Sequence, residues 1–216
     1  MSFIKNLIYK FLNKKISIIY NKRFSQHQNT PKGVFWNSKL SQDLRLNIIL
    51  DKIIDNSKSD TFTIADIGCG YGRFFEIIKE RNLQDKIKYA GVDINKNFIS
   101  FCKNNIQLKQ ANFYEEISPG QKFDYIIMSG TYNLTPTKNL KLWEDYLTKN
   151  LKSNWKNVQK AMVFNCLINK ERKIKSKLYY TEISWIKKFC EENLNKPKIS
   201  KHNLLEGDIT IFIEKN

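Results

Sequence analysis

The segment Ile64–Gly72, which reads IADIGCGYG, limits the folds open to this chain more than any other feature. A short apolar run, Phe62–Ile67, stops at the glycines Gly68, Gly70 and Gly72, and a helical pattern follows. Glycine lets the backbone turn sharply and approach a ligand with no Cβ in the way. The free N–H groups at the start of the following helix favour an anionic group. The segment therefore predicts a ligand-binding turn between a strand and a helix, of a kind that nicotinamide-binding folds also use.

Strand-like and helix-like segments alternate from residue 62 onward. Strands are expected at residues 62–67, 87–94, 106–112, 123–129 and 161–167, followed by a closing hairpin of residues 198–205 and 208–214. Helices are expected at residues 74–80, 96–105, 140–151 and 181–193. Repeated units of this length build a parallel sheet with helices on both faces. We expect an α/β fold with a doubly wound, mostly parallel seven-stranded sheet and an antiparallel C-terminal hairpin.

Two further helices are expected before the sheet, at residues 2–20 and 38–56. We divide the chain into a helical N-terminal extension or lid, residues 1–57, and a Rossmann-like domain, residues 58–216. The first helix places apolar side chains at i, i+3, i+4 and i+7, with lysines between them. This pattern favours a helix packed on the domain, and an interfacial membrane helix is the alternative.

The cysteines and the hydropathy pattern exclude several protein classes. Four cysteines stand far apart with no CxxC pair, which argues against a disulfide framework and a zinc cluster. No uncharged run approaches the roughly 20 residues that span a bilayer, and the first residues lack a small-residue cleavage site. We expect a cytoplasmic protein with no bound metal and no transmembrane segment.

Two acidic residues give the glycine turn a more specific meaning. The dinucleotide fingerprint requires its third glycine at position 73, where this chain has Arg73. Asp66 stands two positions before Gly68, and Asp93 ends the second expected strand, 21 residues after Gly72. A carboxylate at that strand end can accept hydrogen bonds from both hydroxyls of a ribose.

With these residues, the segment 62–214 resembles the class I, Rossmann-like S-adenosylmethionine-dependent methyltransferases. The resemblance implies that Asp66, Gly68 and Gly70 surround the methionine end of S-adenosylmethionine. It implies that Asp93 binds the ribose and that Ile94 packs on the adenine. At the end of the third expected strand, Asn112 stands where the family usually has an aspartate near the adenine amino group. The complete set of expected cofactor contacts is Asp66, Gly68, Cys69, Gly70, Asp93, Ile94, Asn112, Phe113 and Ser129.

The fourth expected strand, which begins with Phe123 and Asp124, resembles the family's "FD" strand, and its end, residues 129–133, would face the transferring methyl group. Tyr132 and His202 are the residues we expect to handle a proton, if the reaction needs one. Upstream of the cofactor core, we expect Trp36, Gln42 and Arg45 to line the acceptor site. An ordinary turn with the tryptophan in the core is the alternative for that segment.

Two nucleic-acid chemistries of the family are disfavoured by the sequence. The fourth strand ends in Ser129–Tyr132 without the Pro-Pro-aromatic box of enzymes that methylate amino groups of bases. None of the cysteines follows a proline, as the nucleophile of cytosine C5 enzymes does. We expect methylation of an oxygen or nitrogen atom of a small-molecule or saccharide-like acceptor. An RNA methyltransferase and an inactive, methyltransferase-like binding module remain alternatives.

The net charge of +16 belongs to the flanks of the chain. Residues 43–137 carry equal numbers of bases and acids, whereas residues 1–42 carry no acid and residues 138–201 carry 16 bases and 6 acids. Lysine far outnumbers arginine, although sites that bind phosphates or bases favour the arginine fork. Solvated lysine faces are therefore the favoured interpretation of this basic protein, with contact to a nucleic acid or an anionic membrane as the alternative.

Overall fold

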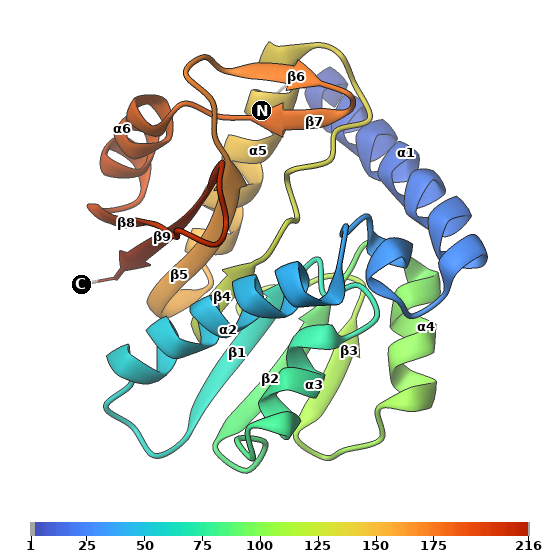
Figure 1. The fold of residues 1–216 in the computed structure, drawn as a ribbon, viewed down its shortest axis with the longest axis vertical. Helices are drawn as coiled ribbons and strands as arrows, with labels where there is room; N and C mark the ends of the chain where they lie inside the picture. Colours follow the sequence, from blue (N-terminus) through green and yellow to red (C-terminus); the bar gives the residue numbers. More distant parts are fainter. Residues whose placement is uncertain (1–2, 216) are drawn as a thin grey trace.

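The computed structural model describes residues 3–215, which form a seven-stranded sheet covered by helices (Figure 1). The strand order is β3-β2-β1-β4-β5-β9-β8. Strands β1 to β5 run parallel, and β9 runs antiparallel to both β5 and β8. The bounds are β1 Phe62–Ile67, β2 Ile87–Val92, β3 Ala111–Tyr114, β4 Phe123–Met128, β5 Val158–Leu167, β8 Pro197–Lys201 and β9 Asp208–Glu214. The expected doubly wound sheet with an antiparallel C-terminal hairpin is confirmed.

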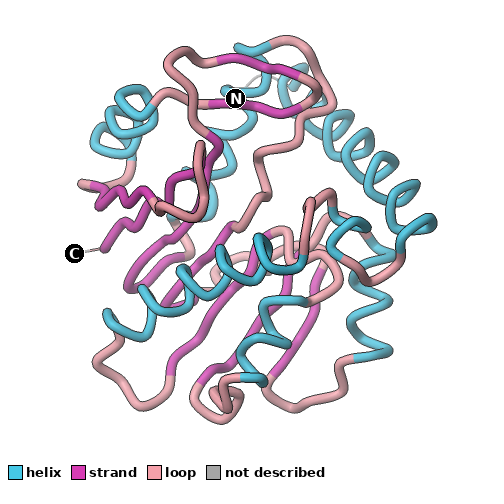
Figure 2. The backbone as a smooth tube through the Cα atoms, in the orientation of Figure 1, coloured by secondary structure: helices cyan, strands magenta, loops and turns pink. Residues whose placement is uncertain are grey.

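Helices cover both faces of this sheet, as the expected parallel arrangement requires (Figure 2). The helices are α1 Phe3–His27, α2 Lys39–Asn56, α3 Arg73–Glu80, α4 Lys96–Asn105, α5 Leu140–Trp155 and α6 Ile183–Asn193. One hydrophobic core joins α2, α3 and α4 to the sheet, and the other joins α1, α5 and α6 to it. Alternate residues of β5 serve the two cores, with Val163 in the first and Phe164 in the second. Burial on both faces explains why the strands read as nearly continuous apolar runs.

The N-terminal residues are part of these cores. Tyr9 and Leu12 of α1 are buried against α5, where the rings of Tyr9 and Tyr146 lie 5.8 Å apart. Helix α1 continues beyond the expected helix of residues 2–20 and ends at His27, whereas Ser2 lies outside the described residues. A short 3-10 turn, η1 (Pro31–Val34), then leads into α2, whose N-cap is Ser38. The chain thus returns across the carboxyl ends of the strands.

The third strand lies later in the chain than the sequence predicts. The expected strand of residues 106–112 is wrong, because Ile106 is the C-cap of α4 and β3 begins at Ala111. A Cβ on Gly72 would lie 2.6 Å from Cδ1 of Ile106, so this apolar side chain packs beneath the glycine turn instead of in a strand. A small hairpin after β5, made of β6 (Lys173–Lys175) and β7 (Leu178–Tyr180), was not expected. Its segment is too short and too lysine-rich to show a strand pattern.

The strand order creates one crevice at the carboxyl edge of the sheet. From β1 the chain moves outward to β2 and β3, and then returns to place β4 on the other side of β1. The helices that follow β1 and β4, α3 and α5, therefore pack on opposite faces of the sheet, which leaves a crevice above the ends of the strands. In doubly wound sheets this topological switch point is where ligands bind.

Candidate functional site

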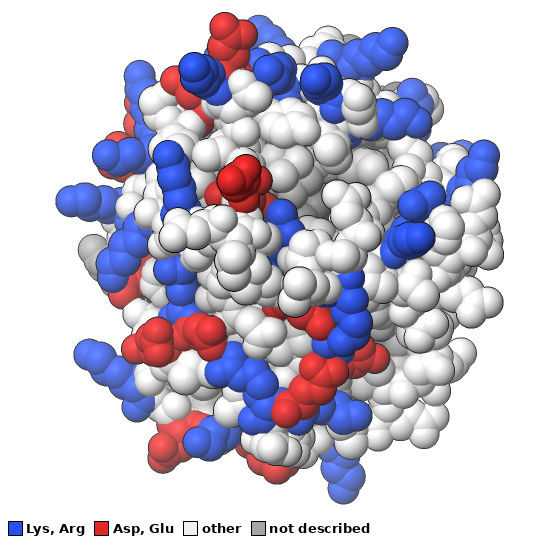
Figure 3. Space-filling model, in the orientation of Figure 1, with Lys and Arg blue, Asp and Glu red and all other residues white. Residues whose placement is uncertain are grey.

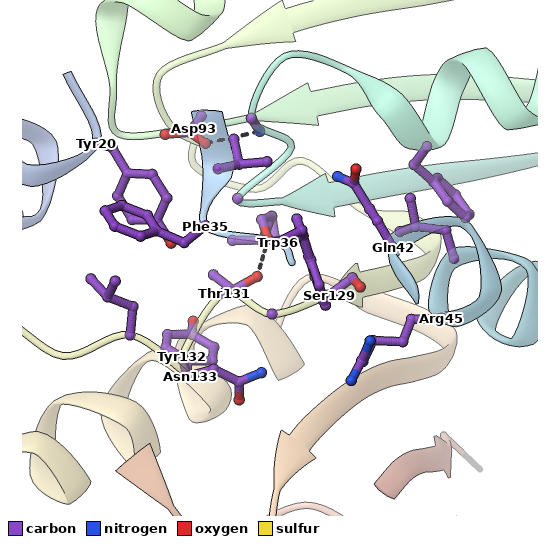
Figure 4. Close-up of a pocket in the computed structure, with 18 of the residues that line it drawn as sticks. Tyr20, Phe35, Trp36, Gln42, Arg45, Asp93, Ser129, Thr131, Tyr132 and Asn133 are labelled. Carbon is purple, nitrogen blue, oxygen red and sulfur yellow. Dashed lines mark hydrogen bonds between the residues drawn. The ribbon is translucent and has the colours of Figure 1, made fainter. Parts of the chain in front are cut away.

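A cavity of about 490 Å³ lies at this switch point. Its floor is formed by the loops after β1, β2 and β4, and its walls by α1, the η1 segment and the start of α2 (Figure 4). On the molecular surface the hollow is bordered mainly by uncharged side chains (Figure 3). Enclosed cavities of a few hundred Å³ with aromatic and polar walls are typical of sites for small molecules.

The glycine turn after β1 forms one side of the cavity floor. Gly68 and Gly70 have φ values of +81° and +56°, which L side chains rarely adopt. A Cβ on Gly68 would lie 2.8 Å from Cγ2 of Thr131, and the Thr131 hydroxyl donates to the carbonyl of Ile67 at 2.7 Å (Figure 4). The loops after β1 and β4 are therefore packed directly against each other, and a larger residue at position 68 would separate them.

Asp93, at the end of β2, faces the same turn. Its Oδ2 accepts from the backbone N–H of Gly70 at 3.0 Å, and its Oδ1 accepts from the N–H of Asn95 at 2.8 Å. Burial raises the pKa of Asp93 to about 6, although both N–H groups favour the ionised form. The carboxylate is thus fixed at the cavity wall, with lone pairs remaining for hydroxyl donors.

Asp66 is the second acid in the cavity wall, and it is 4% exposed. Its Oδ2 accepts from the hydroxyl of Tyr89 at 2.8 Å. Burial raises the pKa of Asp66 to about 7, with the hydrogen bond from Tyr89 acting against this rise and the nearby Asp93 adding to it. Both acids that the sequence singled out therefore lie at the cavity and have perturbed pKa values, as is common at functional sites.

Two buried polar groups in the cavity wall have no hydrogen-bond partner in the described structure: Oγ of Ser129 and Nδ2 of Asn95. Buried polar groups are seldom left without a partner, because the loss of hydration is unfavourable. Ser129 follows β4 and Asn95 follows β2, so the two groups stand on different sides of the switch point. A polar ligand that fills the cavity would satisfy both.

The three residues predicted for the acceptor site, Trp36, Gln42 and Arg45, all line the cavity. Arg45 stacks over Trp36, with 4.8 Å between the guanidinium carbon and the ring centroid. Its Nε also donates to Oδ2 of Asp208 at 2.7 Å. Gln42 is buried, and its Oε1 accepts from the Tyr71 hydroxyl at 2.8 Å.

Because Gly130 has no side chain, the ring of Trp36 can pack directly against the backbone after β4. A Cβ at this position would lie 2.7 Å from Cζ2 of Trp36. The N–H of Gly130 donates to Oδ1 of Asn165 at 2.6 Å, and the amide of Asn165 lies 3.5 Å from Asp208. These hydrogen bonds connect the tryptophan side of the cavity to β5 and β9.

The two residues predicted to handle a proton lie in different surroundings. His202 does not line the cavity, and its Nε2 lies 3.2 Å from Oγ1 of Thr210 in the terminal hairpin. Tyr132 lines the cavity but is 6% exposed, and burial raises the pKa of its phenol far above the usual value. Tyr132 therefore stays protonated and cannot act as a base near neutral pH.

Three of the predicted cofactor contacts also lie outside the cavity. Asn112 and Phe113 are in β3 itself and line a separate shallow depression, because the strand begins later than predicted. Phe113 packs under the sheet, 2.5 Å from where a Cβ on Gly91 would be. The Cys69 thiol is buried and donates to the Gly70 carbonyl, and burial raises its pKa well above the usual value. The Cys69 side chain therefore packs in the core beside the turn and does not face the cavity.

Several wall residues were not predicted. Tyr20 of α1 and Tyr146 of α5 line the cavity, together with Phe35 and Asn150. Among the described residues no cluster of histidine, cysteine and acidic side chains could hold a metal ion. Within the same residues no helix is long and apolar enough to cross a bilayer.

Known proteins share both the sequence pattern and the fold. A family model described as a methyltransferase domain matches residues 58–216. A Mycobacterium tuberculosis protein, Rv1506c, which is provisionally named a methyltransferase, is 23% identical over 160 residues, 73% of this chain and 95% of its own.

Solved structures show the same architecture at low identity. Magnesium protoporphyrin IX methyltransferase from Synechocystis, with bound S-adenosylhomocysteine, aligns with a TM-score of 0.65 at 11% identity and covers 98% of this chain and 100% of its own. The Burkholderia thailandensis 1,6-didemethyltoxoflavin N1-methyltransferase, also with S-adenosylhomocysteine, gives a TM-score of 0.66 at 10% identity, covering 94% and 88%. An amino pentose methyltransferase from Micromonospora echinaspora, with S-adenosylmethionine, gives 0.57 at 10% identity, covering 81% and 91%. This chain belongs to the class I methyltransferases, whose methyl donor is S-adenosylmethionine.

Proposed function

We propose that the enzyme methylates an oxygen or nitrogen atom of a small acceptor with little net charge, such as an aromatic or saccharide-like metabolite. The observation that carries this proposal is the closed acceptor wall, in which Trp36 packs on Gly130 under the guanidinium of Arg45. Tyr20 and Tyr146 add two aromatic rings to the same cavity. The toxoflavin and amino pentose enzymes, which share the fold, are named for small acceptors of these kinds.

The charge of Arg45 is already balanced inside the protein. Its ion pair with Asp208 is short, and the aspartate side chain is only 1% exposed. A guanidinium held in this way does not require an anionic acceptor and serves instead to orient the indole ring beneath it. This supports a flat, neutral acceptor more than a phosphate or carboxylate compound.

The residues of the cavity fit S-adenosylmethionine. We assign the ribose hydroxyls to Asp93 and the methionine end to the backbone of Gly68 and Gly70, beside Asp66. The unpartnered groups of Ser129 and Asn95 offer further polar contacts to the same molecule. When bound, S-adenosylmethionine supplies an electrophilic methyl group on a sulfonium centre.

The protein's part in the reaction is then to position the acceptor and to exclude water. Methyl transfer from a sulfonium is an in-line displacement, so most of its acceleration comes from holding the nucleophile in line with the methyl group. The buried phenol of Tyr132 can donate a hydrogen bond but cannot take up a proton. We therefore propose that the acceptor atom enters deprotonated, or loses its proton to solvent after transfer.

Residues 1–57 enclose the acceptor in this proposal, since Tyr20, Phe35 and Trp36 all come from that segment. An RNA acceptor is less well supported, because the hollow in Figure 3 is bordered mainly by uncharged side chains and not by Lys and Arg. A cytoplasmic location is proposed from the four buried, unpaired cysteines.

The test measures release of S-adenosylhomocysteine from S-adenosylmethionine with pools of aromatic metabolites, saccharides and total RNA. We expect release with a small-molecule pool, and roughly tenfold less or lower at limiting S-adenosylmethionine when Asp93→Ala replaces the native enzyme. Release with RNA alone would reject the small-acceptor proposal. Turnover by Asp93→Ala at the native rate would reject the cofactor assignment.

A further inference from the structure

Helix α1 carries two apolar faces, and only one of them is covered. Tyr9 and Leu12 of the inner face are buried against α5. The outer face consists of Phe3, Ile4, Leu7, Phe11 and Ile18, which recur at the spacing of one helical stripe and are 55–82% exposed. Exposed apolar side chains gathered on one face in this way mark an interaction surface.

The helix that carries this outer face has only basic charged residues. Between Phe3 and His27 the chain has six Lys and Arg residues and no acid: Lys5, Lys10, Lys14, Lys15, Lys22 and Arg23. Nζ of Lys15 lies 4.6 Å from the ring centroid of Phe11, so the aliphatic part of this lysine runs along the apolar stripe. Lysines that cover apolar surface with their methylenes and hold the ammonium at its edge are typical of helices at a membrane surface.

We propose that α1 binds flat on an anionic membrane surface, with Phe3, Leu7 and Phe11 among the acyl chains and the lysines at the headgroups. Apolar burial and charge complementarity both support this occupant. A second copy of the chain would bring the same lysines against each other. RNA would neutralise the positive charge of the helix but would leave its large apolar side chains exposed to water.

This inference concerns a surface outside the cavity and holds for any acceptor. The helix is 25 residues long, which gives it about 37 Å of contact along the surface. Binding of this kind is peripheral, in agreement with the finding that no described helix could span a bilayer.

Co-sedimentation of the full chain with phosphatidylcholine vesicles, with and without phosphatidylserine, tests the proposal. We expect binding to the vesicles that contain phosphatidylserine and a decrease with added salt. The variant Phe3→Ser/Leu7→Ser/Phe11→Ser should lose at least tenfold in partitioning. Leu40→Ser is the matched control, because Leu40 is 80% exposed but lies on α2. Circular dichroism establishes that each variant is folded.

Several results of these experiments would overturn the membrane proposal. Native protein that fails to bind either vesicle, or a triple variant that binds like the native chain, overturns the proposal. A dimer that sedimentation equilibrium detects for the native chain but not for the triple variant, with no vesicle binding, assigns the face to a second copy. RNA binding that the triple variant keeps, again without vesicle binding, assigns the charge to RNA and also overturns it.

Discussion

Arg45 and Asp208 form a buried ion pair, 2.7 Å between Nε and Oδ2, that joins α2 to the first residue of the last strand. Removal of the arginine leaves the buried carboxylate without a partner, which costs about 3–5 kcal/mol. We therefore expect Arg45→Met to lower the free energy of unfolding by about that amount in urea denaturation. Arg81→Met is the control, since its pair with Asp51 is solvent-exposed and contributes about 0–1 kcal/mol. Equal losses in the two variants would contradict this account.

Asp93 should dominate cofactor affinity. Hydrogen bonds to a charged group contribute about 1.5–3 kcal/mol, so Asp93→Ala should weaken binding of S-adenosylhomocysteine by roughly 10- to 100-fold. Glu115→Gln is a suitable control, because Glu115 is an exposed acid just after the neighbouring strand β3. Isothermal titration calorimetry measures both affinities. If Asp93→Ala bound S-adenosylhomocysteine with native affinity, Asp93 would have no role in binding the cofactor.

Asp66 should make stability depend on pH. Its pKa is about 7 in the folded chain and about 3.9 when unfolded, so the folded state holds the proton more tightly. The stabilisation is complete below about pH 4 and is lost as the pH rises through about 7, a fall of up to about 4 kcal/mol. Urea denaturation at several pH values should show this fall in the native chain. The fall should be smaller in Asp66→Asn, in which the raised pKa of Asp93 still contributes, and parallel curves for the two proteins would contradict the prediction.

The glycine turn allows backbone strain and steric clash to be separated. Gly68 and Gly120 have nearly equal φ values of +81° and +80°, but a Cβ would meet Thr131 at 2.8 Å in the first and nothing within 4 Å in the second. Alanine at either position should cost about 1–2 kcal/mol of stability through strain. Only Gly68→Ala should also weaken S-adenosylhomocysteine binding, by tenfold or more, in calorimetry. Equal affinities in the two variants would show that contact between the loops does not shape the site.

The glycine turn after β1 and the position of Asp93 beside it could be predicted because they depend on local spacing. The backbone conformation at Gly68 and Gly70, and the position of Asp93 at a strand end, follow from short stretches of sequence. The apolar Ile106 was misread as part of a strand, since a helix cap that packs into the core has the same composition. That single error placed Asn112 at the end of a strand, whereas it lies inside β3, one residue after the strand begins.

The acceptor side depends on contacts between distant parts of the chain. Arg45 could be selected from its surroundings, but its partner Asp208 lies 163 residues away and belongs to no motif. Asn165, which fixes the N–H of Gly130, was equally unmarked because it lies within an apolar strand. His202 lies outside the cavity wall because its side chain turns toward Thr210 of the adjacent strand, which depends on the hairpin register.

The two apolar faces of α1 raise the question of what orients this helix. Burial of apolar area alone would allow either face to pack inward, since both carry large side chains. Polar groups favour the observed orientation: the Tyr146 hydroxyl donates to Asn13 at 2.6 Å, the Asn97 amide donates to Asn21 at 3.0 Å, and the lysines beside the outer face stay in water. The hydrogen bonds of these two asparagines hold α1 in one rotation about its own axis. They keep Tyr20 in the cavity wall while Phe11 stays outside, so the hydrophobic effect holds the helix in place and hydrogen bonds give it direction.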